Sequence, residues 1–201
     1  MQHRGVEFDQ GGFQPTYAVD VGPESPARGW RCAAYTFDET GEAAPGLDAI
    51  GSTVLVRFTA ATTEWVGQFV GGGLGGTSQV LATPDPGRCC VIAEGRAYLV
   101  DIEAMPPRAE VVMDWVRSAE TNSSPPLLVL ADGTNAAAVG PDGVWWRTER
   151  LAIDDLTIVA ISSSGIELKC DNPFVGGIRH IVLDLSTGQQ IGGPRLPDAF
   201  R

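Results

Sequence analysis

The chain has 201 residues, a length that fits one domain or at most two small ones. Hydrophobic residues make up 43% and charged residues 19%, which excludes an intrinsically disordered chain. The formal net charge of -11 is spread over both halves without a basic block, which argues against a nucleic-acid surface and against an anionic membrane surface.

Glycine and proline divide the chain into short segments. The 25 glycines and 14 prolines are too frequent for long helices. Between them lie runs rich in Val, Ile, Leu, Thr and aromatic residues, which predict strands. In chain order we expect strands at Tyr17–Val21, Arg31–Phe37, Thr53–Thr59, Glu64–Val70, Gln79–Ala82, Cys89–Ala93, Ala97–Ile102, Leu127–Ala131, Ala136–Val139, Val144–Arg147, Leu156–Ile161, Ile166–Cys170 and His180–Leu185.

Two segments are harder to assign. Arg108–Ser124 contains neither glycine nor proline, and its apolar residues fit a helix and a strand almost equally. We predict a strand there. Gly71–Gly87 holds six glycines and two prolines and predicts a long loop, which could also be a seam between two parts of a single domain spanning residues 1–201.

Turn residues separate many of the predicted strands. Glu94-Gly95, Asp132-Gly133, Asp142-Gly143 and Ser164-Gly165 each lie between two apolar runs, and Thr187-Gly188 follows the last one. Such pairs favour hairpins, because glycine adopts positive φ without a steric penalty. The sequence therefore predicts antiparallel meanders.

An apolar strand followed by a turn recurs in the second half of the chain. The turns fall at Gly95, at Gly133, 38 positions later, and at Gly165, a further 32 positions on. Units of this length are typical of β-propeller blades. Three copies are too few for a closed ring, so we predict an all-β domain with propeller-like hairpins, with a β-sandwich as the alternative.

Two segments resemble known proteins. Val182–Gly188 reads VLDLSTG and looks like the strand and turn of quinoprotein-type propeller blades. The stretch Ala137–Thr148, AAVGPDGVWWRT, together with Arg150, Leu151 and Leu156, resembles a run in uncharacterised bacterial proteins. The likeness is confined to roughly the C-terminal half. It implies a β-rich domain and no particular activity.

The candidate cofactor and metal motifs lack the neighbouring residues or the spacing that binding requires. Gly71–Gly76 contains G-x-G-x-x-G, but Thr77–Ala82 is too short for the helix that a dinucleotide needs, and no lysine follows for a phosphate-binding loop. Cys89 and Cys90 are adjacent on a strand and should face opposite sides. With Cys32, Cys170 and two histidines they lack zinc-ligand spacing. We expect no cofactor, no metal and four reduced, buried thiols.

The sequence contains no recognisable set of catalytic residues. His3 lies at the N-terminus, and His180 shares a predicted strand with Asp184, but no serine elbow accompanies them. Carboxylate pairs for hydrolysis exist by proximity alone, at Asp38-Glu39 and Asp154-Asp155. We therefore assign no catalytic residue.

The adjacent tryptophans are the most informative feature of the sequence. Alternation along a strand places Val144 and Trp146 on one face, and Trp145 and Arg147 on the other. Because Arg147 prefers solvent, we predict that the Trp146 face is the core. Trp145 and Arg147 are then the candidate interaction residues, since Trp and Arg are enriched at binding hot spots.

These observations favour a non-enzymatic protein-interaction module, with an acidic inhibitor or immunity-type partner of a basic protein as one version. A small-ligand or carbohydrate-binding module using Trp145 is the first alternative, and a hydrolase with a carboxylate pair is the second. The N-terminal residues show no secretory signal and no apolar run is long enough to span a bilayer. The bias towards arginine over lysine suggests a bacterial source, and we expect a cytoplasmic protein.

Overall fold

The computed structural model describes residues 6–24, 29–73, 76–171, 176–197 and 199. Within these residues it contains eighteen strands and no α-helix, which confirms the all-β prediction. The strands are β1 (Phe8–Asp9), β2 (Ala18–Val21), β3 (Ala33–Phe37), β4 (Ala43–Pro45), β5 (Thr53–Thr59), β6 (Glu64–Val70), β7 (Gln79–Ala82), β8 (Arg88–Ala93), β9 (Arg96–Asp101), β10 (Arg108–Met113), β11 (Ser118–Ser123), β12 (Pro126–Ala131), β13 (Ala136–Gly140), β14 (Gly143–Arg147), β15 (Thr157–Ser162), β16 (Gly165–Asp171), β17 (Ile178–Leu183) and β18 (Gln190–Gly192).

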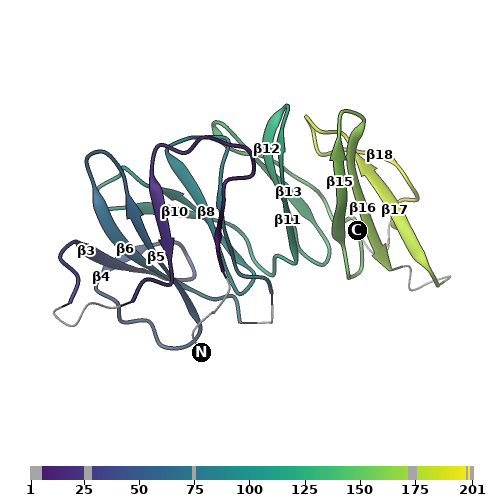
Figure 1. Ribbon diagram of the computed structural model, residues 1–201. Helices are drawn as coiled ribbons and strands as arrows, with labels where there is room; N and C mark the ends of the chain where they lie inside the picture. The colour runs from purple at the N-terminus through teal and green to yellow at the C-terminus, as the bar shows by residue number, and fades with distance from the viewer. Residues whose placement is uncertain (1–5, 25–28, 74–75, 172–175, 198, 200–201) are drawn as a thin grey trace.

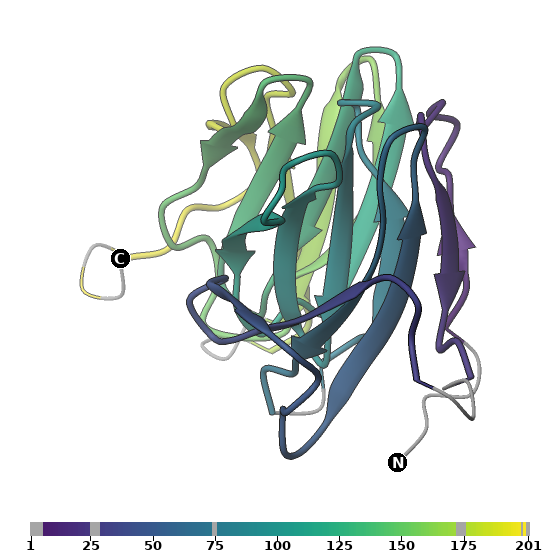
Figure 2. The ribbon, with the colours of Figure 1, turned by 90° about the vertical axis from the view of Figure 1, so that its left-hand side faces the viewer.

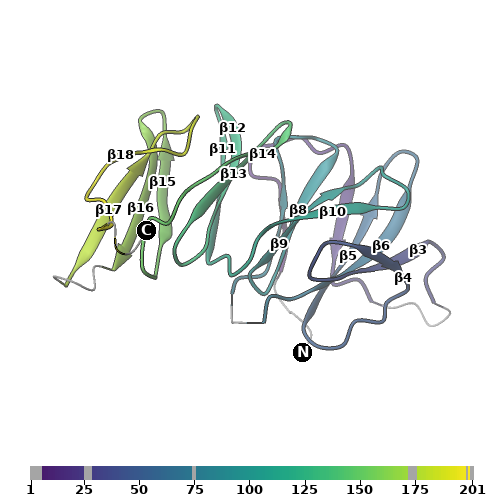
Figure 3. The ribbon, with the colours of Figure 1, turned by 180° about the vertical axis from the view of Figure 1, so that it is seen from behind.

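The strands form four sheets stacked face to face (Figures 1 and 3). We number the sheets by their position in the stack. The first has the order β2-β5-β6-β3-β4, the second β1-β7-β8-β9-β10, the third β11-β12-β13-β14 and the fourth β15-β16-β17-β18. Neighbouring strands are antiparallel except in two pairs, β1 with β7 and β3 with β6. Figure 2 looks along the stack from the first sheet.

The second, third and fourth sheets repeat one unit, a meander of four consecutive strands. These meanders begin at residues 79, 118 and 157, so each starts 39 residues after the one before. The repeat seen in the sequence is correct for β8 and β12, which occupy equivalent positions. The third copy of the predicted repeat is displaced by one strand. Leu156–Gly165 covers β15, which is the first strand of its meander, whereas β8 and β12 are the second strands of theirs.

Three hydrophobic cores fill the spaces between the four sheets. The first core is aromatic: the rings of Phe37 and Phe69 stack with centroids 4.6 Å apart, and Trp65 packs 4.6 Å from Phe58. The polar atoms of its aromatic side chains have partners, since Trp65 Nε1, Tyr17 Oη and Tyr98 Oη each donate to a backbone carbonyl. Burial raises the pKa of Tyr98 to about 12. The first core is therefore fully apolar apart from satisfied donors.

The second and third cores are aliphatic. The second lies between the second and third sheets and includes Leu99 and Leu130, and the third lies between the third and fourth sheets and includes Leu127 and Leu168. Cys89 packs in the first core and its neighbour Cys90 in the second. This confirms that the two thiols point to opposite faces of one strand.

The outer faces of the two end sheets carry paired charged side chains. On the first sheet, Asp20 and Arg57 pair across β2 and β5, with Nη2 and Oδ2 2.7 Å apart. On the fourth sheet, His180 Nδ1 lies 2.9 Å from Glu167 Oε1. Each of these residues alternates with side chains that point into a core. The fourth sheet also exposes large apolar side chains, since Val159, Ile178 and Ile191 are 46%, 62% and 59% exposed.

Two stretches differ from the sequence-based expectation. Arg108–Ser124 is not one strand but two, β10 and β11, separated by a link that contains Trp115. Gly71–Gly87 is not entirely a loop, because it contains β7, the strand predicted separately at Gln79–Ala82, and it connects the first sheet to the second. The short strands β1, β4 and β18 lie at sheet edges and carry no clear sequence pattern.

A β-bulge in β14 corrects the predicted faces of the two tryptophans. Ala138 pairs with Trp146, and the next residue, Val139, pairs with Val144, so Trp145 is the extra residue. Val144 therefore packs against the second core and Trp146 in the third. The prediction that they share a face is wrong, because a bulge shifts the alternation by one residue. The predicted burial is confirmed, with Trp146 8% exposed and Trp145 47% exposed.

Trp146→Ala should lower the free energy of unfolding by about 3–5 kcal/mol, the usual loss when a buried aromatic side chain is removed. Its ring contacts Gly188 closely and its Nε1 donates to the Leu185 carbonyl at 2.9 Å, so the space cannot easily collapse. Trp145→Ala should cost about 1 kcal/mol, because a half-exposed indole loses only part of its burial. Urea melts of both variants measure the difference. Equal large losses would show that Trp145 is structural as well.

Candidate functional site

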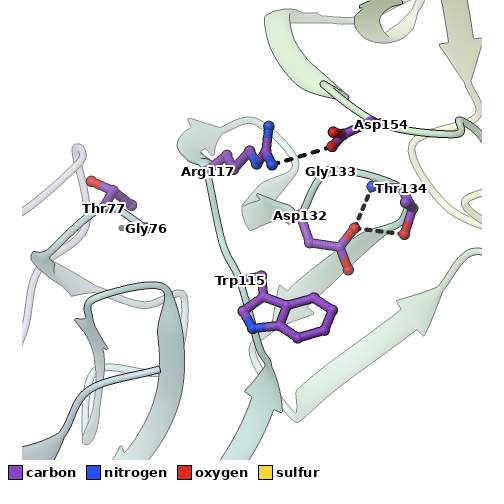
Figure 4. A pocket seen from close by; sticks show the side chains of 8 residues that line it. All are labelled: Gly76, Thr77, Trp115, Arg117, Asp132, Gly133, Thr134 and Asp154. Carbon is purple, nitrogen blue, oxygen red and sulfur yellow. Dashed lines mark hydrogen bonds and ion pairs between the residues drawn. The ribbon is translucent and has the colours of Figure 1, made fainter. Parts of the chain in front are cut away.

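A cleft lies where turns and links of the second, third and fourth sheets meet. It consists of two adjoining cavities of about 700 and 660 Å³ that share Trp115 and Asp132, and we call it the Trp115 cleft. Figure 4 shows the first cavity, with Trp115 below Asp132 and with Arg117 and Asp154 opposite the indole. The first cavity is lined by Gly76, Thr77, Trp115, Arg117, Asp132, Gly133, Thr134 and Asp154.

The floor of the cleft is held by a ring of three backbone hydrogen bonds. Gly95 N donates to Thr77 O at 2.8 Å, Thr77 N donates to Val116 O at 3.2 Å, and Val116 N donates to Gly95 O at 2.7 Å. These residues come from the segment before β7, the β8–β9 turn and the β10–β11 link. We call this arrangement the backbone junction. It fixes the backbone position of Trp115, the residue that precedes Val116.

Glycines make the backbone junction sterically feasible. A Cβ atom on Gly76 would lie 2.5 Å from the Gly95 Cα, and one on Gly95 would lie 3.1 Å from the Trp115 Cα. A Cβ on Gly72 would similarly lie 2.8 Å from the Glu94 carbonyl oxygen. The glycine-rich segment is thus explained by close backbone packing, and strand β7 follows it where a dinucleotide fold would have a helix.

Trp115 is the central residue of the cleft. Its backbone is left-handed, with φ at 61°, and its side chain is 56% exposed. A bulky residue in this conformation costs on the order of 1–3 kcal/mol and persists where surrounding structure determines it, often at functional sites. No sequence pattern predicts this conformation, because Trp115 lies in a segment whose residues are those of a continuous strand.

Three arginines and three aspartates line the two cavities. Arg96 Nε binds Asp114 Oδ1 at 2.7 Å. Arg117 binds Asp154 at 3.2 Å and Asp155 at 2.5 Å. Partial burial acts to lower the pKa of Arg96, but its hydrogen bonds to Asp114 and Tyr98, together with the negative charge of Asp114, outweigh this effect and raise the pKa. The formal charges of the lining therefore cancel, in contrast to the strongly acidic chain as a whole.

The remaining wall of the cleft is a polar turn. Asp132 Oδ1 accepts hydrogen bonds from the backbone nitrogens of Thr134 and Asn135, at 2.5 and 2.7 Å. Asn135 Nδ2 in turn donates to the Thr148 carbonyl at 3.2 Å. This turn presents carboxylate, hydroxyl and amide groups on a fixed backbone, so the cleft offers both donors and acceptors.

The structure places one of the two predicted interaction residues in the cleft. Arg147 lines the second cavity, where its Nη2 donates to the Val112 carbonyl at 3.1 Å. Trp145 does not line either cavity, and its ring lies against Gly140. Arg147 is therefore brought together with Trp115 instead of Trp145.

The weaker catalytic candidates are not brought together. His180 binds Glu167 on the outer face of the fourth sheet. Asp184 Oδ1 accepts from the hydroxyls of Ser186 and Thr187, and these bonds lower the pKa of the Asp184 carboxyl. His3 lies outside the described residues.

The two carboxylate pairs also serve local structure. Asp154 and Asp155 both bind Arg117, and both are more than half exposed. In the other pair, Asp38 Oδ1 accepts a hydrogen bond from the Thr40 hydroxyl, which lowers the pKa of the Asp38 carboxyl. Asp154 lines the first cavity of the Trp115 cleft, where its carboxylate is paired with Arg117, and Asp38 and Glu39 line neither cavity of that cleft.

Two other kinds of feature are absent from the described residues. No three His, Cys, Asp or Glu side chains within that part of the chain are placed to hold a metal ion. The same part contains no helix with the length and apolarity needed to cross a bilayer. All four cysteines are free thiols, and burial raises the pKa of each, to about 12 for Cys90.

No protein-family model, no curated protein and no solved structure matches this chain. The resemblance to propeller-type blades thus stays a prediction, and the role of the cleft has to be inferred from its own residues.

A glycine variant is usually less stable than the alanine variant at the same position, and at position 115 we expect the reverse. Alanine keeps the steric penalty of a left-handed backbone and glycine removes it. Trp115→Gly should therefore be more stable than Trp115→Ala by about 1 kcal/mol in urea melts. The matched pair Val112→Gly and Val112→Ala, in β10, should show alanine as the more stable variant. The same order at both positions would contradict the strained backbone at Trp115.

Thiol reactivity should follow burial. The Cys32 side chain is partly accessible, whereas Cys89, Cys90 and Cys170 are buried and have raised pKa values. At pH 8 the folded protein should show one fast-reacting thiol with a disulfide reagent, and four after denaturation. Cys32→Ser should remove the fast phase. A fast phase that persists in that variant would show that a core cysteine is exposed by local opening.

Proposed function

We propose that the protein is a non-enzymatic binding module whose Trp115 cleft takes a neutral, polar small ligand of the carbohydrate class. The observation that carries this proposal is the half-exposed Trp115 indole, fixed on a strained backbone between two cavities. An indole held in advance of binding offers a flat apolar surface on which a sugar ring can stack, and little conformational entropy is lost on binding.

The lining of the cleft supports a neutral ligand. Its three arginines and three aspartates cancel in formal charge, and four of these six side chains pair with one another at the rim, Arg96 with Asp114 and Arg117 with Asp154. Paired charges still offer hydrogen-bond donors and acceptors, which a polyol can satisfy without bringing a charge of its own. Each cavity has the size of an ordinary small-ligand site.

A second candidate is an interaction with a basic protein partner. The net charge of -11 favours it, because an acidic surface attracts a basic protein and speeds association. Trp115 and Arg147 in one cleft also have the composition of an interface hot spot. The two candidates differ in salt dependence: association with a basic partner weakens as salt is added, and sugar binding does not.

For the finer architecture, we propose that the three 39-residue meanders are blades of the propeller type, arranged as an open stack. The shared strand order, the constant period and the face-to-face packing support this. We also propose a bacterial, cytoplasmic protein. Its four unpaired cysteines support a reducing compartment, and its 14 basic residues include a single lysine, Lys169.

The proposal is tested by titrating the protein with a panel of neutral mono- and oligosaccharides and following binding by calorimetry. Trp115→Ala should weaken binding of any sugar that binds by roughly tenfold or more, the effect of removing an aromatic anchor. Trp145→Ala is the matched control, because that indole is similarly exposed but lies outside the cleft. Binding that is lost in Trp145→Ala and kept in Trp115→Ala would refute the assignment. A panel without any binder, together with salt-sensitive binding of an arginine-rich peptide, would favour the protein partner.

A further inference from the structure

A separate cavity of about 490 Å³ lies between the end of β14 and the segment that surrounds β18. Its charged lining consists of Arg147, Arg150, Arg195 and one acid, Glu149. Hydroxyl and amide groups of Thr187 and Gln189 complete the polar wall. In a chain with a net charge of -11, a cavity whose lining carries a formal excess of two positive charges is unexpected.

Two of the three arginines of this cavity, Arg150 and Arg195, have no acidic partner among the described residues, whereas Arg147 Nη2 lies 3.5 Å from Glu110 Oε1. Arg150 Nε and Nη2 donate to the backbone carbonyls of Ala152 and Ile153, at 3.0 and 3.2 Å, which are uncharged acceptors. Within the described part of the chain, neither Arg150 nor Arg195 forms an ion pair. A guanidinium has five donors, so most of those of Arg150 remain available to a ligand.

The walls that carry these groups are anchored to the core. Leu151 and Leu196, the neighbours of Arg150 and Arg195, are 7% and 3% exposed. The buried Arg179 donates to the Pro194 carbonyl, and Gln190 Nε2 donates to the Gly192 carbonyl at 3.1 Å. The arginines therefore project from fixed backbone on two sides of the cavity, which is the preorganisation that anion recognition requires.

The turn between β17 and β18 is fixed in the same way. Asp184 Oδ1 accepts hydrogen bonds from the backbone nitrogens of Ser186 and Thr187, at 3.0 and 2.9 Å. Gly188, with φ at 66°, lies directly against the ring of Trp146. The Thr187 and Gln189 side of the cavity thus rests on the third core.

From these observations we infer that the cavity bordered by Arg147, Arg150 and Arg195 binds an oxyanion, the phosphate or carboxylate group of a small ligand. Guanidinium groups bind such oxygens through short, charge-assisted hydrogen bonds, often two at a time. The hydroxyl of Thr187 and the amide of Gln189 add neutral donors. This inference does not rest on the proposal that Trp115 binds a sugar, although Arg147 and Thr148 line both cavities.

The test is calorimetric titration with inorganic phosphate and, in a second arm, with acetate. Phosphate should bind saturably, and Arg195→Gln should weaken it by roughly tenfold, the effect of losing one charge-assisted contact. Arg195 is exposed and forms no ion pair within the described residues, so this variant should fold normally. Arg150→Gln should act in the same direction, with its thermal unfolding checked because its bonds hold the backbone. Tighter binding in the acetate arm would identify a carboxylate as the ligand group.

Arg57→Gln is the matched control, because Arg57 lies on the outer face of the first sheet, at the other end of the stack. It should bind phosphate as the unmodified chain does. Equal weakening in Arg57→Gln and Arg195→Gln would mean that phosphate responds to overall charge, and the inference would be wrong. Absence of saturable binding by both anions would also overturn it. Neither result would affect sugar binding at Trp115, which is measured with a neutral ligand.

Discussion

The architecture depends on the packing of the second and third sheets, each of which is covered on both faces. Strand β8 is buried from Cys89 to Ala93, and β13 is buried throughout from Ala136 to Gly140. Such strands can carry no polar side chain on either face, because every position points into a core. Along these buried strands, polar groups are therefore confined to the strand ends and to the turns and links that follow them. Both the Trp115 cleft and the arginine cavity lie in such places.

Turns that belong to different sheets can form a site only if their backbones approach closely. The backbone junction of Thr77, Gly95 and Val116 provides this contact, and each hydrogen bond in it satisfies a group that a turn would otherwise leave to water. Glycines at 76 and 95 permit the approach. The strain at Trp115 follows from the same geometry, since its neighbour Val116 both donates to and accepts from the junction.

Much of the fold could be read from the sequence, and the site could not. Runs such as Thr53–Thr59 and Gln79–Ala82 were predicted with their observed bounds, because local apolar patterns and turn residues determine strands. The break between β10 and β11 escaped detection, since no glycine or proline marks it and the left-handed residue is a tryptophan. The bulge at Trp145 was likewise invisible, because it depends on pairing with β13. Arg147 was predicted as an interaction residue because arginine is enriched at binding hot spots. Its proximity to Trp115 depends on contacts between sheets, which no local sequence pattern predicts.

The contrast between the two cavities shows why net charge is a poor guide to local binding. At physiological ionic strength the screening length is about 8 Å, so acids spread over the whole surface contribute little inside a particular cavity. What a ligand meets is the first layer of side chains. In the Trp115 cleft, Arg96 and Arg117 are matched by acids a single hydrogen bond away. In the arginine cavity, Arg150 is held by carbonyls and keeps its charge unmatched. One acidic chain can therefore present a neutral site and a cationic site in two cavities that share Arg147 and Thr148, and the ligand at each is selected by local contacts instead of by the total charge.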